Sequence, residues 1–349
     1  MKKLISIITI AALMFASLSG CTASDRHERF KARENSTTPD DDTLNIVATI
    51  FPLYDFTRAI VNDNANVTML LNPGTEIHSY DPSPADIIKI QNADIFIHIG
   101  EERGSWVERI LDSMDTSDKK IIKLMDYIDL IGEEVVEGMH EYYLDDDHDH
   151  DDDHHHDHDD DHDDDHHHDH DEHSEYDEHI WTSPKNAISM INTIAHYISE
   201  IDSKNSEIYL QNAKAYTGEI EEIHNEIQKV VDTAERDILI FGDRFPFVYF
   251  VKEYGLDYRA AFTGCSTESE ASAGTLAFLI NTIREKNIPY IYHVELSTKN
   301  IARVLGEETG AEALLMHSIH NVSQSELESG ESYVSLMRQN IESLRKGLN

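Results

Sequence analysis

The residues best suited to chemistry form one short run of histidine and aspartate. Residues 145–173 contain 16 Asp, 1 Glu and 12 of the chain's 22 histidines, with no Lys or Arg. Neutral imidazole nitrogens are ligands for zinc, copper or nickel, and the carboxylates add oxygen ligands without fixing one geometry. A run with no apolar residue cannot bury a core and must be a solvated loop. Its composition predicts weak and interchangeable binding of several divalent cations.

An eight-residue motif occurs twice in this run. Residues 151–158 read DDDHHHDH, and residues 163–170 repeat the same letters. The alternative interpretation is an acidic spacer with incidental histidines, and the density of histidine argues against it. We expect the auxiliary metal ligands of the loop to be the histidines of the two copies, namely His154, His155, His156, His158, His166, His167, His168 and His170.

The chain carries a large excess of acidic residues. It has 349 residues, with 28 Lys and Arg against 68 Asp and Glu, which gives a formal net charge of −40 at pH 7. This balance excludes a nucleic-acid binder built on overall basic charge. The length favours two domains, and a hydrophobic content of 40% is enough to bury a sizeable core.

The first residues have the pattern of an export signal. Two lysines precede an apolar run over residues 4–15, and small residues lead to Cys21. This indicates a lipoprotein signal peptide over residues 1–20, whose end resembles a bacterial lipobox with Cys21 as the lipidated residue. The apolar run is shorter than the roughly 20 residues of a membrane span, which argues against a retained transmembrane anchor. We expect an extracytoplasmic protein, anchored to the bacterial cell membrane by its lipid, with residues 21–43 as a disordered tether.

The chain has only two cysteines, Cys21 and Cys265. If Cys21 carries lipid, Cys265 has no partner within the chain, and no disulfide framework can hold the fold. An unpaired thiol in an exported protein is either buried and inert or held by a group such as a metal.

Beyond residue 43, short apolar runs alternate with helical patterns. This alternation is typical of βα units with parallel sheets and predicts an α/β fold with two βα lobes. Strands are expected at residues 44–49, 67–71, 94–99 and 120–124, and again at 238–241, 257–262, 290–294 and 313–316. Helices are expected near residues 52–63, 83–92, 104–114, 245–254, 272–287, 298–309 and 331–346.

One long amphipathic helix is predicted between the lobes, because apolar residues recur at three- and four-residue steps from 204 to 234. We therefore divide the body into an N-terminal α/β lobe over residues 44–203, which includes the His/Asp-rich loop 141–175, a linking helix over 204–235, and a C-terminal α/β lobe over 236–349. Ligand groups should gather at the carboxyl ends of the strands, in a cleft between the lobes. Two independent domains with an ordinary connector remain the alternative.

Two segments resemble the metal-ligand segments of a known family, the metal-binding subunits of bacterial zinc and manganese ABC importers. Residues 72–86, NPGTEIHSYDPSPAD, follow a predicted strand and open a helix, as the first ligand segment of that family does. Residues 177–184, DEHIWTSP, resemble the second, which follows a histidine-rich loop. The resemblance implies that His78 and His179 are metal ligands.

The third and fourth segments depart from the family pattern. Residues 249–256, YFVKEYGL, are similar to the helix after the third ligand, which then falls on Arg244. A guanidinium offers no lone pair to a metal, so Asp243, one residue away, is the first candidate substitute. Near the C-terminus His317 stands where manganese members have Asp, and imidazole there favours zinc.

The resemblance therefore implies a site with three imidazole nitrogens, from His78, His179 and His317. Asp243, Cys265 or water would complete a tetrahedron around the metal. Three other histidines near strand ends are interpreted as structural or supporting residues, namely His98, His293 and His320.

The function implied is that of a lipid-anchored receptor that captures Zn²⁺, with Mn²⁺ less favoured, and hands it to the transmembrane permease of an ABC importer. Ligands from both lobes would make metal binding and lobe closure one event. We expect a monomer that binds no nucleic acid and is not an enzyme, because neither a His-Glu-x-x-His helix nor a Gly-x-Ser-x-Gly elbow is present. The alternatives are a manganese or iron receptor of the same family, or a surface metal-storage or adhesion lipoprotein with no transport role.

Overall fold

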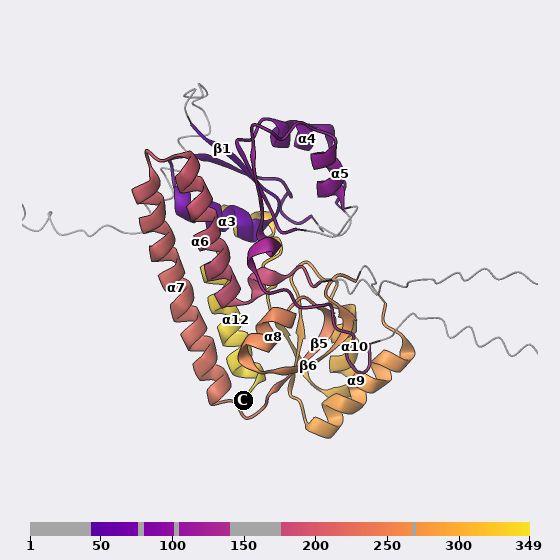
Figure 1. Cartoon of the computed structure of the whole chain (residues 1–349). Helices are drawn as coiled ribbons and strands as arrows, with labels where there is room; N and C mark the ends of the chain where they lie inside the picture. The colour runs from indigo at the N-terminus through magenta and orange to yellow at the C-terminus, as the bar shows by residue number, and fades with distance from the viewer. Residues whose placement is uncertain (1–42, 76–79, 101–104, 140–175, 267–269) are drawn as a thin grey trace, which may run out of the picture. The chain divides into compact units, whose positions relative to one another are not determined.

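The computed structural model describes residues 43–75, 80–100, 105–139, 176–266 and 270–349, and Leu44–Asn349 form one compact unit (Figure 1). The predicted signal peptide, the tether with Cys21, the segment with His78 and the His/Asp-rich loop lie outside these residues. Within the described part of the chain, no helix combines the length and the apolar character that a membrane span requires.

The first sheet has four parallel strands in the order β2-β1-β3-β4. Its central strands are continuous apolar runs, and Ile95, Phe96 and Ile97 are each fully buried. Burial on both faces is typical of parallel sheets with helices on either side. The elements are β1 Asn45–Ala48, α3 Phe51–Val61, β2 Asn66–Met69, α4 Pro84–Gln91, β3 Ile95–His98, α5 Trp106–Asp112 and β4 Lys120–Lys123.

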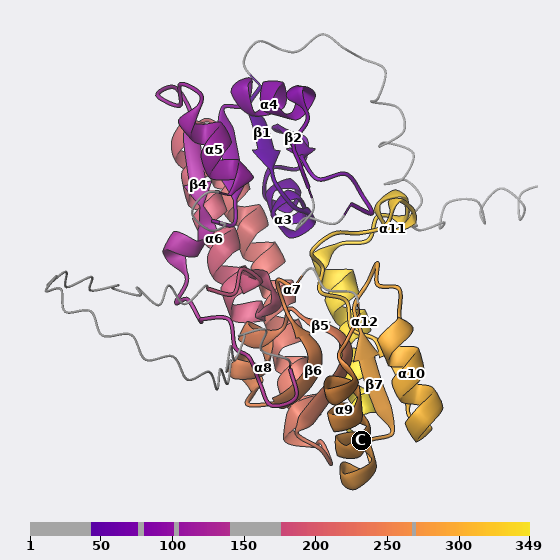
Figure 2. The same cartoon turned by 90° about the vertical axis from the view of Figure 1, so that its right-hand side faces the viewer.

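The second sheet repeats this topology, with parallel strands in the order β6-β5-β7-β8. Helices α9 and α10 pack against each other and against this sheet, and α12 contacts β7 and β8 (Figure 2). The predicted α/β class with two parallel sheets is thus confirmed. The elements are β5 Ile238–Phe245, α8 Val248–Tyr254, β6 Asp257–Thr263, α9 Ala273–Lys286, β7 Tyr290–His293, α10 Asn300–Thr309, β8 Glu312–Leu315, α11 Gln324–Ser329 and α12 Tyr333–Gly347.

Two long helices connect the sheets along the chain. Helix α6 spans Pro184–Ile201, and α7 spans Ser206–Asp232, within the range predicted for the linking helix. Helix α7 packs against α3, α6 and α12, so its apolar stripe contacts helices from both parts of the chain (Figure 1). Helices α6 and α11 were not among the predicted elements.

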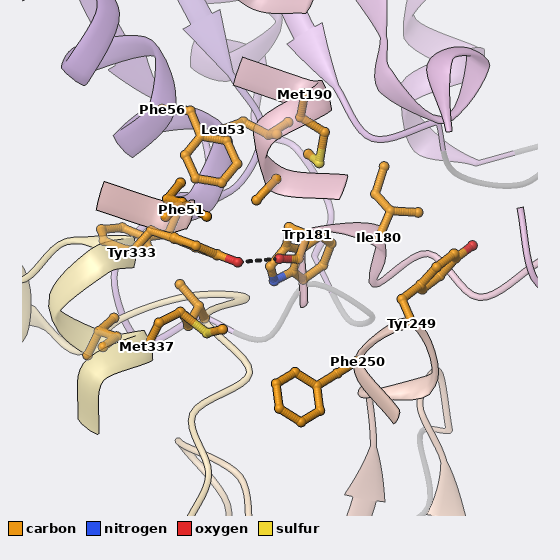
Figure 3. Packing of buried hydrophobic residues seen from close by; sticks show 14 of the residues in the cluster. Phe51, Leu53, Phe56, Ile180, Trp181, Met190, Tyr249, Phe250, Tyr333 and Met337 are labelled. Atoms are coloured by element: carbon orange, nitrogen blue, oxygen red, sulfur yellow. Dashed lines mark hydrogen bonds between the residues drawn. The ribbon is translucent and has the colours of Figure 1, made fainter. Parts of the chain in front are cut away.

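The indole of Trp181, two residues after the predicted ligand His179, lies in the main core. Side chains from α3, α6, α8 and α12 surround it, among them Phe51, Met190 and Phe250 (Figure 3). The Tyr333 hydroxyl donates a hydrogen bond to the Trp181 carbonyl at 2.8 Å, and the Trp181 indole N–H donates to the Ser318 carbonyl at 2.8 Å. One buried side chain therefore joins the segment around His179 to the loop after β8.

Removing the Tyr333 hydroxyl tests this junction. We expect Tyr333→Phe to lower the free energy of unfolding by about 1–2 kcal/mol, because a fully buried carbonyl loses a hydrogen-bond donor. Urea denaturation measures the change. Tyr127→Phe is the matched control, since the Tyr127 hydroxyl pairs with that of Tyr197 at an exposed position and its loss should cost less than about 0.5 kcal/mol. Equal losses in the two variants would contradict a special role for Tyr333.

Candidate metal centre

One cavity lies at the carboxyl ends of all four strands of the second sheet. The order of the strands explains its place, because β5 and β7 are neighbours whose connections leave in opposite directions, and such a switch point opens a crevice. The cavity is lined by Arg244 and Pro246 after the β5 bulge, Gly264 after β6, Val294, Glu295 and Leu296 after β7, Ser318, His320 and Asn321 after β8, and by Thr75 and His179 from the first part of the chain.

His179 reaches this cavity from a rigidly held segment. It precedes the short 3-10 helix Ile180–Thr182, whose residues are all buried, and its own side chain is 1% exposed. Asp177 Oδ1 accepts hydrogen bonds from the His179 backbone N–H at 2.8 Å and lies 3.2 Å from His179 Nδ1. With the Nδ1 proton directed at Asp177, Nε2 is the nitrogen suited to a metal.

Asp177 is itself held in place by a tyrosine of α8. The Tyr249 hydroxyl donates to the Asp177 carbonyl at 2.9 Å and accepts from the backbone N–H of Ile131 at 3.1 Å. The second carboxylate oxygen, Oδ2, is buried, has no hydrogen-bond partner within the described residues, and would lie 3.0 Å from a β-carbon placed on Gly264. A carboxylate this buried needs a nearby positive charge.

The pKa of His179 reflects the same surroundings. Burial by itself lowers the pKa, but the nearby carboxylates, with Asp177 first among them, outweigh burial and raise the pKa above its ordinary value. The site therefore favours a positive charge on or next to this imidazole, and a bound cation supplies one.

His320 faces the same cavity from the second part of the chain. Its ring lies 5.4 Å from that of His179 between centroids, at an interplanar angle of 88°, and 5.0 Å from the indole of Trp181. Trp181 thus contacts both imidazoles, since its centroid is 5.3 Å from that of His179. Two imidazoles from residues 141 positions apart in the sequence share one cavity.

Glu295 fixes the loop that carries His320. Its carboxylate accepts hydrogen bonds from the Ser318 backbone N–H at 2.7 Å and from the Ser318 hydroxyl at 2.5 Å. It also lines the cavity, so it is a further oxygen donor near the imidazoles. The described residues nevertheless contain no group of three His, Cys, Asp or Glu side chains close enough to hold a metal ion.

Asp243 and Arg244, though adjacent in sequence, have different surroundings in the structure. The register between β5 and β6 shifts between Phe241 and Arg244, and Asp243 Oδ2 accepts from the Val294 backbone N–H at 3.2 Å, which ties β5 to β7. Its Oδ1 accepts from the Arg244 N–H at 2.9 Å. Arg244 lines the cavity, whereas Asp243 does not.

Neither Cys265 nor His317 lines the cavity either. The Cys265 backbone N–H donates to Glu133 at 3.1 Å, and burial, with help from nearby carboxylates, raises the pKa of its thiol, which disfavours the thiolate that a metal needs. His317 is 1% exposed, and its Nδ1 accepts a hydrogen bond from the Ile319 backbone N–H at 2.9 Å. Each of the two residues is adjacent in sequence to a residue that lines the cavity, Gly264 or Ser318, but does not line it itself.

Sequence reasoning assigned His320 a supporting role, and the structure places it on the cavity wall. The segment around it reads HSIHN, so two histidines lie three residues apart after the same strand. The backbone turn between them decides which one faces the cavity, and no local pattern predicted that turn. Thr75 on the wall is the last described residue before the segment that contains His78, and His78 itself lies outside the described residues.

Comparison with known proteins decides the family. The model of the family described as zinc-uptake complex component A, periplasmic (ZnuA), matches residues 46–347. The chain belongs to this family. The resemblance drawn from the segments at residues 72–86 and 177–184 is confirmed at that level.

Family members of two lengths are similar to this chain. The zinc-binding lipoprotein AdcA of Streptococcus pneumoniae is 31% identical over 307 residues, which is 88% of this chain and 56% of the relative. The chain therefore spans little more than half the length of that protein. The high-affinity zinc uptake system protein ZnuA of Bacillus subtilis is 30% identical over 347 residues, 99% of this chain and 98% of the relative.

A solved structure agrees with the fold. The crystal structure of the Zn(II)-bound ZnuA-like domain of Streptococcus pneumoniae AdcA superposes with a TM-score of 0.68 at 27% identity, covering 88% of this chain and 99% of that domain.

Asp177→Asn tests whether the buried carboxylate serves His179. The amide keeps the volume but removes the negative charge beside the imidazole, and loss of such a partner costs about 10- to 100-fold in metal affinity. We expect a fall of that size in zinc affinity, measured by competition with a chelating dye. Asp118→Asn is the control, because that side chain is 80% exposed and remote from the cavity lining. Unchanged zinc affinity in Asp177→Asn would contradict the role.

Proposed function

We propose that the chain is an extracytoplasmic zinc receptor, which captures Zn²⁺ in this cavity and delivers it to the permease of an ABC importer. The observation that carries the proposal is the pair of imidazoles, His179 and His320, on one cavity wall. Membership of the zinc-uptake family supports it, as do the similar proteins named for zinc binding and zinc uptake.

The spacing of the two rings fits a single zinc ion. With Zn–N distances of about 2.0–2.1 Å and a near-tetrahedral angle, the centroids of two ligating imidazoles lie about 5 Å apart. The observed 5.4 Å is close to this value. The separation of the two rings is therefore compatible with their sharing one ion.

We propose two further ligands, one from the cavity wall and one from the segment that follows Thr75 in the sequence. Glu295 is the described oxygen donor on the wall, and Thr75 leads along the chain to His78, which we propose as a third nitrogen ligand. Asp243, Cys265 and His317, which the sequence also suggested, contact other groups and do not line the cavity.

The donor set favours zinc over manganese. Imidazole nitrogen suits zinc, whereas manganese prefers carboxylate, carbonyl and water oxygens. Arg244 offers no lone pair to a metal, so it adds no oxygen ligand to the wall. A zinc receptor is thus favoured over the manganese or iron receptor of the same family.

The other parts of the functional model lie outside the described residues. We propose that lipid on Cys21 anchors the chain outside the cytoplasmic membrane, and that the histidines of residues 145–173 gather divalent cations close to the start of the His179 segment. The first proposal rests on the resemblance of the segment before Cys21 to a bacterial lipobox. The second rests on the composition of the loop and on its place before a segment that resembles the second ligand segment of the family.

Alanine substitution of the two imidazoles tests the zinc site. We expect His179→Ala and His320→Ala each to weaken zinc binding by at least about 100-fold, since each removes one of a small number of direct ligands. Zinc affinity is measured in competition with a chelator strong enough to keep the loop's weaker sites empty. Cells carrying either variant should also fail to grow when zinc is scarce.

The control for these variants is His196→Ala. His196 lies on α6 with a 63% exposed side chain, and its nearest charged partner is Glu200 on the same helix. Its substitution should leave zinc affinity and growth unchanged. Wild-type affinity in His320→Ala would refute the assignment of this residue as a ligand, and wild-type growth in both variants would refute the transport role.

A further inference from the structure

His317 has a buried place of its own in the loop after β8, three residues before the cavity histidine His320. Its side chain is 1% exposed. Asn340 of α12 holds its backbone from both sides: the His317 N–H donates to Asn340 Oδ1 at 2.7 Å, and Asn340 Nδ2 donates to the His317 carbonyl at 2.8 Å. The backbone at this point is therefore clamped to α12.

The His317 ring makes one well-defined hydrogen bond. Its Nδ1 lies 2.9 Å from the Ile319 backbone nitrogen, which donates to it, and 3.5 Å from Glu295 Oε1. The shorter contact decides the chemistry, because a nitrogen that accepts a hydrogen bond carries the lone pair and not the proton. The proton then sits on Nε2, which is buried and points towards Glu326, 3.6 Å away.

The residue that this bond holds is in a strained conformation. Ile319 has φ of +63° and is 1% exposed. Positive φ is unusual for any residue with a β-carbon and is a true outlier for a β-branched one, so the surroundings must impose it. The hydrogen bond from Ile319 to His317 spans two residues, like the turn in which an Asn or Asp side chain accepts the N–H two residues on.

The strained turn directs the next residue into the cavity. His320 follows Ile319 directly, and its ring lies 5.0 Å from that of Trp181 and 5.4 Å from that of His179. If the bond at Ile319 were lost, the residue could relax towards negative φ, and the backbone entering His320 would rotate. The hydrogen bond from Ile319 to His317 is therefore one of the contacts that set the direction of the chain into His320.

From this arrangement we propose that His317 is a positioning residue for His320, acting through Nδ1, and not a zinc ligand acting through Nε2. The proposal rests on the proposed function, in which His320 ligates zinc. It assigns a task to each histidine of the HSIHN segment: one shapes the turn and the other binds the metal.

A pair of amide substitutions separates the two ring nitrogens. His317→Asn places Oδ1 where Nδ1 stands, so it can still accept the Ile319 N–H, but nothing remains at the place of Nε2. His317→Gln carries its polar atoms about as far as Nε2 and has only a methylene at the place of Nδ1. Both amides are uncharged and differ by a single methylene, so each is the matched control of the other.

The measurements are zinc affinity and the visible absorption of Co²⁺ substituted for zinc, in the full chain with chelator present to keep weaker sites empty. We expect His317→Asn to stay within about threefold of wild type with the same Co²⁺ spectrum. We expect His317→Gln to lose about 10- to 100-fold in zinc affinity. Its Co²⁺ spectrum should match that of His320→Ala, because the same nitrogen is lost from the metal.

Other outcomes overturn the proposal. If His317→Asn loses affinity and alters the spectrum while His317→Gln keeps both, Nε2 is a ligand. If the two variants behave alike, the turn at Ile319 does not position His320. Should the Gln variant fail to fold, which its urea transition would reveal, wild-type affinity in the Asn variant still excludes a ligand role. His317→Ala, which also removes Nδ1, then replaces the Gln variant in the comparison. A wild-type chain without a tight zinc site, or with His320→Ala unaffected, would instead refute the proposed function.

Discussion

The arrangement of the cavity depends on the buried indole of Trp181. The indole N–H donates a hydrogen bond to the Ser318 carbonyl, and the backbone carbonyl of Trp181 accepts one from the Tyr333 hydroxyl. Both partners come from the second part of the chain. A side chain of this size, fully surrounded by core residues, cannot move without disturbing helices from both parts of the chain. Because His179 precedes it by two residues and the ring of His320 packs on it, the two imidazoles keep their separation.

A second constraint is electrostatic. The chain is strongly acidic, which attracts cations from solution, but the cavity itself contains few charges. The carboxylates nearest the imidazoles are used as hydrogen-bond acceptors: Asp177 for His179, and Glu295 for the loop of His320. These carboxylates orient neutral nitrogen donors, and Arg244 offers no lone pair to a metal. Selectivity for zinc would then arise from the type of donor and not from a high local charge.

Much of the fold followed from the sequence because its signals are local. Each strand was predicted from a short apolar run and lies within a few residues of the predicted range, and α7 was predicted from its three- and four-residue repeat. His179, which lines the cavity, was predicted as a ligand because the segment DEHIWTSP resembles a family pattern. Helix α6 begins at the Pro184 of that same segment, with Ser183 accepting the Asn186 N–H as its cap, but its pattern had not been recognised as a helix.

The last parts of the site could not be predicted in the same way. Which of His317 and His320 faces the cavity depends on the sign of one backbone angle at Ile319, a residue type that rarely adopts it. The role of Asp243 depends on a register shift in β5 that directs its carboxylate to Val294. Both features arise from contacts between distant segments, which a linear pattern does not contain.

The most direct test of the central claim is a titration of the chain with Zn²⁺ and Mn²⁺ after deletion of residues 145–173. The deletion removes the histidines of the loop, so any remaining tight site belongs to the cavity. The account predicts one tight zinc site per chain that far outcompetes manganese. Loss of all tight zinc binding on deletion would contradict it, and the loop itself would then be the metal-binding part of the protein.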